Sequence, residues 1–221
     1  MKVSVIAPHM DDEVLGVGGT IMKHILEGDQ VSVCMVANRA YGHKYLPDMI
    51  ERQKEAALRA KEILGYQEIV FLDLNDEKLD KKIINIIIPL EEYIMRVKPD
   101  IVYVNHYGDS NQDHQAVFKA AMVACRTFTS GNIRKLLCYE TLSSTEQAPP
   151  FPGSIFMPTY YVNIASHLEN KIKALECYDD ELREFPHPRS AQGIRVLAAK
   201  RGMEIGFQVA EAFAIVREKW I

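Results

Sequence analysis

Val3-Ser4-Val5-Ile6-Ala7 is followed at once by Pro8-His9-Met10-Asp11-Asp12-Glu13, and this stretch decides the fold. The first five residues are small or β-branched and predict a buried strand near the start of the chain. An imidazole and three carboxylates at the end of that strand are typical of half of a metal site. The other half is expected at Asn111-Gln112-Asp113-His114.

Short β-branched runs alternate with amphipathic stretches along the chain, which predicts βαβ units on a mostly parallel sheet. The expected strands are 3–7, 31–36, 69–72, 101–104 and 136–139, with a weaker one at 160–164. The expected helices are 14–27, 48–65, 81–97 with a kink or break at Pro89, 114–128, 166–181 and 191–218. We therefore expect one doubly wound α/β domain over residues 1–221, with strand order 3-2-1-4-5 and an additional C-terminal strand.

This strand order brings the two polar motifs together. The first and fourth strands are neighbours in such a sheet, and ligands bind outside the carboxyl ends of the strands where the order reverses. Residues 9–12 leave the end of the first strand, and residues 109–114 leave the end of the fourth. Both motifs are therefore predicted to face the same crevice.

The residue types in the two motifs predict a hydrolytic metal site. A neutral imidazole nitrogen and a carboxylate oxygen are good Zn²⁺ ligands, and a catalytic site needs only three of them. His9, Asp12 and His114 are predicted to supply these three, and Asp113 to orient an imidazole. Asp11 is left as a general base on the metal-bound water, whose pKa a metal lowers from about 15.7 to about 7. Hydrolysis near neutral pH is the expected chemistry.

Composition restricts the partners and the compartment. With 221 residues and 48% hydrophobic residues, the chain suffices for one well-buried domain. A net charge of −4 and the lack of a basic run interleaved with aromatics argue against nucleic acid. We expect no membrane insertion, since the N-terminus carries no signal sequence and the apolar run 83–90 is too short to span a bilayer. Four cysteines without CxxC spacing predict reduced thiols and a cytoplasmic protein.

Further motifs carry a resemblance to a known family. They are Arg52-Gln53-Lys54-Glu55-Ala56-Ala57, Asp113-His114, Pro186-His187-Pro188-Arg189-Ser190 and Ala210-Glu211-Ala212-Phe213. With the first motif they resemble the LmbE-like (PIG-L) family of zinc-dependent N-deacetylases, whose usual first motif is Ala-His-Pro-Asp-Asp-Glu. The resemblance spans most of the chain and implies a Rossmann-like fold, Zn²⁺ on His9, Asp12 and His114, and Asp11 as the base. It also implies hydrolysis of an acetamide on an amino sugar, often a glucosamine conjugate, by a frequently homo-oligomeric enzyme.

The chain departs from the family pattern at two positions of the site. Met10 replaces a common proline, which affects loop rigidity more than chemistry. Asn111 stands where the family often has a His that is credited with binding the oxyanion or protonating the leaving amine. Asn donates a hydrogen bond but cannot transfer a proton as an imidazolium does. We therefore hypothesise that Asn111 helps to bind the oxyanion while Asp11 carries the proton from water to the amine.

Three residues are predicted to contact the substrate, each with a simpler alternative. The family pattern favours substrate contact for Arg52, although an ordinary solvated arginine fits its helix equally well. Asp76 matches a position that the family uses near the sugar, but a helix-capping Asp is nearly as plausible. His187 lies between two prolines and is expected in the crevice rather than on a surface turn. Glu13 is assigned mainly to the positive end of the first helix.

Parts of the sequence are also compatible with three other functions. Gly16-Val17-Gly18-Gly19 is superficially similar to a dinucleotide fingerprint, but Ile21 replaces the third glycine and no ribose-binding acid follows the second strand. Two His and one carboxylate also form the facial triad of non-haem iron oxygenases, which generally lie in β-rich barrels. An amidase that cleaves a thiol-sugar conjugate would share the same core. We therefore predict a deacetylase of N-acetylglucosamine-type conjugates that uses Zn²⁺ or, alternatively, Fe²⁺; the aglycone stays open.

Overall fold

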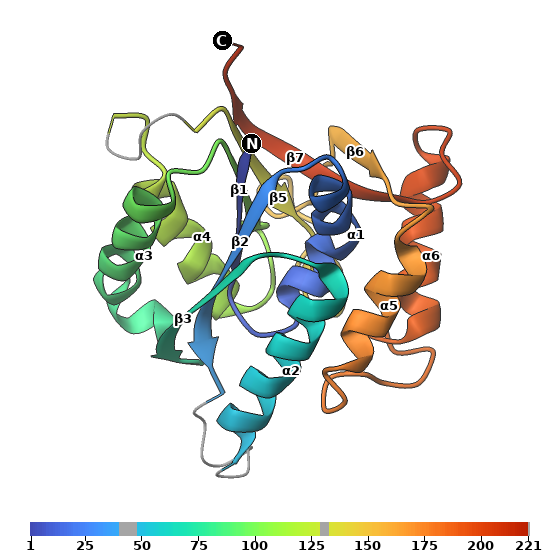
Figure 1. Ribbon diagram of the computed structural model, residues 1–221, viewed down its shortest axis with the longest axis horizontal. Coiled ribbons are helices and arrows are strands. Elements are labelled where there is room, and N and C mark those ends of the chain that lie inside the picture. Colours follow the sequence, from blue (N-terminus) through green and yellow to red (C-terminus); the bar gives the residue numbers. More distant parts are fainter. Residues whose placement is uncertain (40–47, 129–132, 221) are drawn as a thin grey trace.

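A seven-stranded sheet forms the centre of the computed structural model, which describes residues 1–39, 48–128 and 133–220 (Figure 1). The strands are β1 (Lys2–Ala7), β2 (Gln30–Asn38), β3 (Glu68–Asn75), β4 (Ile101–Asn105), β5 (Lys135–Tyr139), β6 (Tyr160–Asn163) and β7 (Ala210–Glu218). Their order is β3-β2-β1-β4-β5-β7-β6, so the predicted 3-2-1-4-5 arrangement is confirmed. The first five strands are parallel, and β7 runs antiparallel to both β5 and β6.

Helices cover both faces of the sheet. They are α1 (Asp12–Leu26), α2 (Met49–Leu64), α3 (Ile84–Val97), α4 (Gln112–Ala124), α5 (Leu168–Glu176) and α6 (Ala191–Met203), with short 3₁₀ turns η1 (Leu79–Lys82) and η2 (Thr145–Gln147). Figure 1 shows α3 and α4 on one face and α1, α2, α5 and α6 on the other. The chain therefore forms the expected three-layer α/β architecture.

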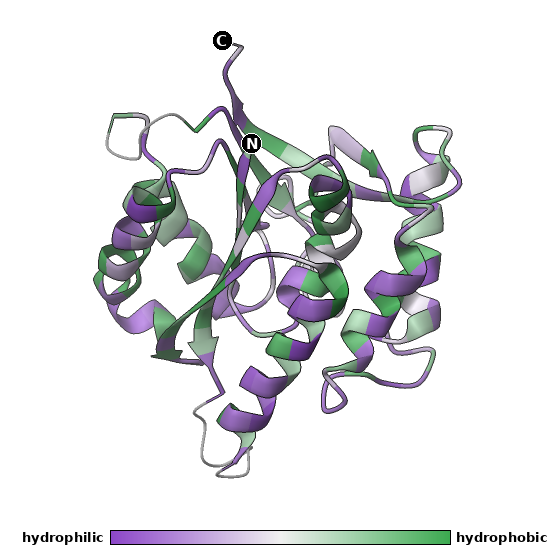
Figure 2. Cartoon of the chain, in the orientation of Figure 1, coloured by the Kyte–Doolittle hydropathy of each residue, from purple (hydrophilic) through white to green (hydrophobic). Residues whose placement is uncertain are grey.

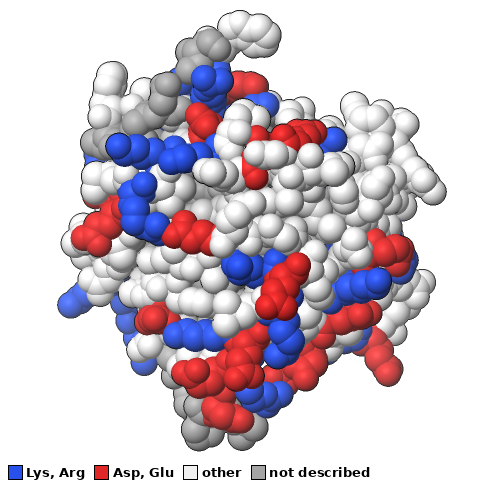
Figure 3. All heavy atoms as spheres, viewed as in Figure 1, with Lys and Arg blue, Asp and Glu red and all other residues white. Residues whose placement is uncertain are grey.

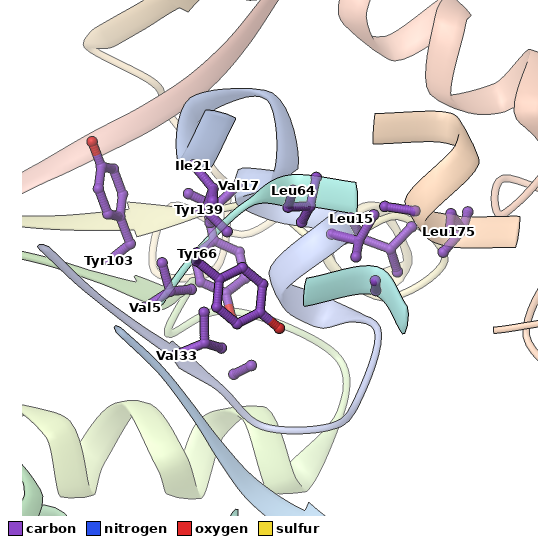
Figure 4. Packing of buried hydrophobic residues seen from close by; sticks show 14 of the residues in the cluster. Val5, Leu15, Val17, Ile21, Val33, Leu64, Tyr66, Tyr103, Tyr139 and Leu175 are labelled. Atoms are coloured by element: carbon purple, nitrogen blue, oxygen red, sulfur yellow. The ribbon is translucent and has the colours of Figure 1, made fainter. Parts of the chain in front are cut away.

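The strands have the period-2 pattern that divides one sheet between two cores. Alternate residues of β1 illustrate it, because Val3 and Val5 pack toward α1 and α2 while Ile6 packs toward α3 and α4. Hydrophobic residues accordingly predominate along the central strands in Figure 2. Figure 4 shows the larger core, where Val17 and Ile21 of α1 lie beside the Tyr139 side chain of β5.

Two predicted helices differ from the structure. The helix expected over 191–218 is wrong beyond Met203, because α6 ends there and residues 210–218 form β7. Gly206, at φ +79°, lies in the turn between them, in a conformation that favours glycine. The helix α3 runs through Pro89 and is not split there, while a kink at Pro89 stays a prediction. The helix also begins later than expected, at Ile84, after the 3₁₀ turn η1. The carbonyl that Pro89 cannot bond belongs to Asn85, which is exposed and open to water.

The glycine run in α1 serves packing. A Cβ on Gly16 would lie 2.1 Å from the Tyr139 ring, and one on Gly19 would lie 2.6 Å from the Ile164 side chain. Only glycine therefore lets α1 approach the sheet and the segment after β6 this closely. This contact explains the glycines that resembled a dinucleotide fingerprint.

A buried ion pair joins β7 and α5 to the same helix. The Glu211 carboxylate accepts hydrogen bonds from the Gly19 and Thr20 backbone N–H groups at 2.9 and 2.7 Å and from Lys171 Nζ at 2.6 Å. Lys171 Nζ also donates to the Leu15 carbonyl at 2.8 Å. Tertiary hydrogen bonding thus holds Glu211 on a strand, although its Ala-rich surroundings favour a helix.

Charged side chains of both signs are distributed over the surface. Acidic and basic side chains are intermixed on the face that Figure 3 shows. No helix within the described ranges has both the length and the apolar character needed to cross a bilayer. All four cysteines are free thiols; Cys34, Cys125 and Cys138 are buried, and Cys177 is half-buried.

Glu211→Gln should lower the free energy of unfolding by about 3–5 kcal/mol, because it leaves the Lys171 ammonium buried without its counter-charge. Urea unfolding followed by circular dichroism measures the change. Lys23→Gln is the control, since it removes an exposed pair with Glu27 on the same α1 and should change stability by less than about 1 kcal/mol. Equal small effects in both variants would contradict a structural role for the buried pair.

Candidate metal centre

The fold brings His9, Asp12 and His114 together at the carboxyl edge of the sheet. His9 lies in the turn after β1, Asp12 is the first residue of α1, and His114 lies in the first turn of α4. Because β1 pairs directly with β4, their two following loops lie side by side. This is the juxtaposition that the strand order predicts.

The ligand atoms of these three side chains form a nearly equilateral triangle. Asp12 Oδ2 lies 3.4 Å from His9 Nδ1 and 3.2 Å from His114 Nε2, and the two nitrogens are 3.2 Å apart. Ligands at about 2.0–2.2 Å from a tetrahedral Zn²⁺ lie about 3.3–3.6 Å from one another. The triangle therefore has the spacing and the N/O donor set of three ligands to one ion, and these residues form a possible His/Asp metal site.

Each imidazole has a carboxylate at its outer nitrogen. His9 Nε2 lies 3.2 Å from Asp113 Oδ2, and His114 Nδ1 lies 3.1 Å from Asp109 Oδ2. Metal-bound histidines commonly have such a partner, which fixes ring orientation and increases ligand basicity. Asp109 is itself held by the Asn111 backbone N–H and the Thr145 hydroxyl, both at 2.9 Å.

The site is electrostatically suited to a cation. Burial opposes a charged His114, but the Asp12 carboxylate and the contact with Asp109 outweigh it and raise the pKa of His114 to about 10. Burial would also raise the pKa of Asp12, yet the neighbouring His114 and His9 hold it well below the usual value. The pKa of His9 is raised because its contacts with Asp113 and Asp12 outweigh the cost of burial. The carboxylates therefore favour positive charge at this point of the crevice.

Asp11 lies between the ligands in an unusual backbone conformation. Its φ is 126°, a value that a residue with a side chain rarely adopts, and its N–H donates to Glu13 Oε2 at 3.1 Å. Burial raises the pKa of Asp11 to about 7, although the nearby Arg189 guanidinium opposes the increase. Arg189 Nη1 donates to Asp11 Oδ2 at 3.0 Å. The carboxylate of Asp11 is thus directed into the crevice and away from α1.

Beside the triangle is a polar cavity of about 370 Å³. Its lining residues are His9, Asp11, Arg39, Asp76, Glu77, Asn111, Gln112, Asp113, Glu181 and Arg189. Among the predicted residues, Asp76 and Asn111 therefore line the same cavity as His9 and Asp11. A cavity lined by carboxylates, amides and guanidinium groups suits a ligand rich in hydroxyl groups.

Asn111 has its side chain fixed by α4. Its Oδ1 accepts a hydrogen bond from the Asp113 N–H at 2.8 Å, which makes Asn111 the N-cap of the helix. Since Oδ1 is used in this way, the Nδ2 amide is the donor that the Asn111 side chain can offer, and Asn111 lines the cavity.

Two predicted substrate contacts lie outside the cavity lining. Arg52 Nη2 pairs with Asp180 Oδ2 at 3.0 Å, and the Arg52 side chain is 40% exposed. His187 is exposed on the loop before α6, where its Nδ1 accepts from the Arg189 N–H at 3.1 Å. The crevice position expected for His187 is thus not observed, because this hydrogen bond directs the ring into a local turn. Substrate contact by either residue stays a prediction, and most of the loop 38–47 lies outside the described residues.

Arg39, Glu181 and Arg189 line the cavity but were not among the residues predicted for the site. The sequence did contain a signal for Arg189, because this residue belongs to the Pro186–Ser190 segment that carries the family resemblance. In that segment the two prolines around His187 favour His187 as the crevice residue, whereas the structure places Arg189, two residues later, at the cavity.

A second acidic group in the described chain has a simpler explanation. His24, Glu27 and Asp29 also bring potential ligand atoms together. However, His24 Nδ1 lies 2.7 Å from Asp29 Oδ2 and His24 Nε2 lies 3.0 Å from the Tyr103 hydroxyl. Both ring nitrogens are therefore used in core hydrogen bonds.

Comparison with known proteins gives consistent relatives. The family model described as PIG-L, GlcNAc-PI de-N-acetylase, matches residues 4–125, more than half of the chain. The uncharacterized deacetylase YaiS of Escherichia coli strain K12 is 32% identical over 144 residues, which are 63% of this chain and 73% of YaiS. The diacetylchitobiose deacetylase of Thermococcus kodakarensis is 26% identical over 234 residues, covering 97% of this chain and 83% of that protein.

A solved structure shares the fold. The N,N'-diacetylchitobiose deacetylase from Pyrococcus horikoshii, complexed with its inhibitor MPG, superposes with a TM-score of 0.79 at 20% identity. The match covers 97% of this chain and 83% of that one. At this identity the likeness extends to the architecture, including the mostly parallel sheet between two helical layers.

Wild-type protein should bind one Zn²⁺ per chain, and Asp12→Ala or His114→Ala should abolish binding in isothermal titration calorimetry with metal analysis. Asp109→Asn should weaken it by about 10- to 100-fold, because Asp109 contacts the outer nitrogen of a ligand. His24→Gln is the matched control and should bind normally. Unchanged affinity in Asp12→Ala would show that the ion binds elsewhere.

Proposed function

The chain belongs to the PIG-L family, and from this premise we propose that it is a metal-dependent hydrolase that removes the N-acetyl group from an N-acetylglucosamine-type conjugate. The observation that carries the proposal is the triangle of His9, Asp12 and His114 donor atoms, one of whose members, His9, lines the same polar cavity as Asp11. The names of these relatives support removal of acetyl groups from amino sugars as the reaction class.

His9, Asp12 and His114 are the residues that would hold the ion. When bound, Zn²⁺ or alternatively Fe²⁺ would polarise the amide carbonyl and increase the acidity of water in the cavity. Asp113 and Asp109 keep the two imidazoles in position for this role.

Asp11 is the proposed general base. Its carboxylate takes a proton from the attacking water as the new carbon–oxygen bond forms, and returns that proton to the amide nitrogen as the carbon–nitrogen bond breaks. The products are acetate and a primary amine. The backbone conformation that directs Asp11 away from α1 supports this role, because a base must reach the cavity rather than the helix end.

Asn111 is the proposed donor to the oxyanion. Its N-cap hydrogen bond leaves Nδ2 as the donor of a side chain that lines the cavity, and a donor fixed beforehand stabilises developing charge without reorganising. Asn111 cannot protonate the amine, so both proton transfers fall to Asp11.

The part of the substrate that enters the cavity is proposed to be the N-acetylated amino sugar, which carries no charge. Asp76 and Glu77 line the cavity together with Arg189, and their carboxylates can accept hydrogen bonds from sugar hydroxyl groups. Arg52 and His187 are proposed to contact the conjugate farther out. A homo-oligomeric, cytoplasmic enzyme is part of the same proposal. The alternative is an amidase on a thiol-sugar conjugate, which would release a longer acid than acetate.

Metal-loaded wild type should release primary amine from a panel of N-acetylglucosamine conjugates, and Asp11→Asn should lower kcat by about 10²- to 10⁴-fold. Fluorescamine detection of amine together with enzymatic detection of acetate checks both products. Metal content measured in parallel keeps loss of the base distinct from loss of the ion. Equal rates in both proteins would exclude Asp11 as the base.

Asn111→Ser should reduce kcat by about 10²- to 10³-fold, because it removes the proposed oxyanion donor. Serine is also a favourable N-cap, so the thermal unfolding temperature of the variant should stay near that of wild type. Asn111→Ala removes both the cap and the donor, and it should lose stability as well as activity. If Asn111→Ser retained wild-type kcat, Asn111 would act only as the helix cap.

A further inference from the structure

Arg189 connects three segments that are distant in sequence. Its Nη1 donates to Asp11 Oδ2 at 3.0 Å and to Glu181 Oε2 at 2.5 Å, and its Nε donates to Ser143 Oγ at 2.6 Å. These partners lie in the loops after β1, after β5 and after α5. The guanidinium therefore connects the turn between β1 and α1 with the loops that follow β5 and α5.

Asp11 depends on this contact. Arg189 hydrogen-bonds the Asp11 carboxylate directly, and its positive charge acts on Asp11 more strongly than that of Arg39, another arginine of the cavity lining. The bond occupies Oδ2 and leaves Oδ1 to act on a bound molecule. Since the Asp11 backbone is already in a rare conformation, rotation about its side-chain bond is the remaining freedom, and Arg189 restricts it.

The backbone around Arg189 is held firmly. Its N–H donates to His187 Nδ1 at 3.1 Å, and its carbonyl accepts from the Arg183 N–H at 3.0 Å. The next residue, Ser190, caps α6 by accepting from the Gly193 N–H at 2.9 Å. A Cβ on Gly193 would lie 2.2 Å from the Pro188 carbonyl, so α6 begins directly against this loop. The backbone from which the Arg189 side chain extends is therefore fixed.

Glu181 restrains the guanidinium from another direction. Its carboxylate pairs with Arg39 and Arg189, and it also lies 3.4 Å from Gln53 Nε2 on α2. A planar guanidinium with several donors at fixed angles can satisfy Asp11, Glu181 and Ser143 together. A lysine ammonium, which is a point charge on a flexible stem, would reproduce the charge but not all of these directions.

We infer that Arg189 is a positioning residue, which holds the Asp11 carboxylate at the cavity by anchoring it to Glu181 and Ser143. The inference rests on the proposed role of Asp11 as the base. Arg189 acts through Asp11, so its loss should change kcat far more than KM. A base displaced by about 1 Å costs on the order of 10²-fold in rate.

Two measurements on metal-loaded protein test the inference. Crystal structures of wild type and Arg189→Met compare the Asp11 carboxylate directly, and we expect it to leave its wild-type position or to occupy several rotamers. Kinetics on the conjugate that wild type hydrolyses should show kcat reduced by about 10²-fold at nearly unchanged KM. The kcat of Arg189→Lys should lie between those of wild type and Arg189→Met. Added guanidinium ion should partly restore the kcat of Arg189→Met.

Arg201→Met is the matched control. Arg201 is also a mostly buried arginine that binds two carboxylates, those of Glu140 and Glu204, but it does not line the cavity. Its replacement should leave the Asp11 position and kcat unchanged. If Arg189→Met proves too unstable, Ser143→Gly removes one anchor of the guanidinium at a residue with φ +67° and should reduce kcat by about two- to tenfold.

The outcomes separate the inference from the proposed function. An Asp11 carboxylate that keeps its wild-type position in the variants would overturn the inference, as would a raised KM with normal kcat, which indicates direct substrate contact. Equal loss of kcat in Arg201→Met would attribute the effect to stability and would overturn it as well. If wild type released no amine, the proposed function would fail, while the crystallographic comparison would still decide whether Arg189 holds Asp11.

Discussion

The pairing of β1 with β4 is the constraint on which the rest of the structure depends. Two parallel strands end side by side there, and α1 and α4 then leave toward opposite faces of the sheet (Figure 1). The gap between the diverging helices holds Asp11, Asp12, Asp109 and Asp113, all buried. So many carboxylates in a region of low dielectric require positive charge nearby. Two imidazoles and the guanidinium groups of Arg39 and Arg189 supply positive charge there, so the electrostatics of the crevice follow from its topology.

The distance between α1 and the sheet affects this crevice, because Asp12 is the first residue of that helix. Gly16 lets α1 approach Tyr139, whose hydroxyl donates to the Ile6 carbonyl at 2.9 Å near the end of β1. Farther along the helix, Glu211 binds the Gly19 and Thr20 N–H groups from β7. The glycines and the buried ion pair therefore have a consequence at the site, since they fix the helix that presents a candidate ligand.

The sequence predicts the features whose signal is local. Short β-branched runs predict the five parallel strands, and polar residues at two strand ends predict that His9, Asp12 and His114 meet beside Asp11. The features that it misses depend on contacts over long distances. Ala210–Glu218 is Ala- and Glu-rich and favours a helix, but the buried bonds of Glu211 and the edge offered by β5 place it in the sheet. Arg189 meets Asp11 across most of the chain, and no spacing rule connects them. His187 has the more reactive side chain, yet its position is set by the turn that orients Arg189.

Asn111 shows how a helix requirement and a chemical requirement meet in one side chain. The N-cap of α4 favours a short side chain with an acceptor, and Asn111 provides it through Oδ1. The same amide group has a second, donating end, which the cap bond leaves available, and Asn111 lines the cavity. An imidazole could exchange a proton there, and an amide cannot. In the proposed reaction the proton must then stay with Asp11 from the attack of water to the departure of the amine. A carboxylate that both accepts and returns a proton has to keep one position throughout, and this explains why a fixed guanidinium beside it, rather than a second titratable group, suits this chain.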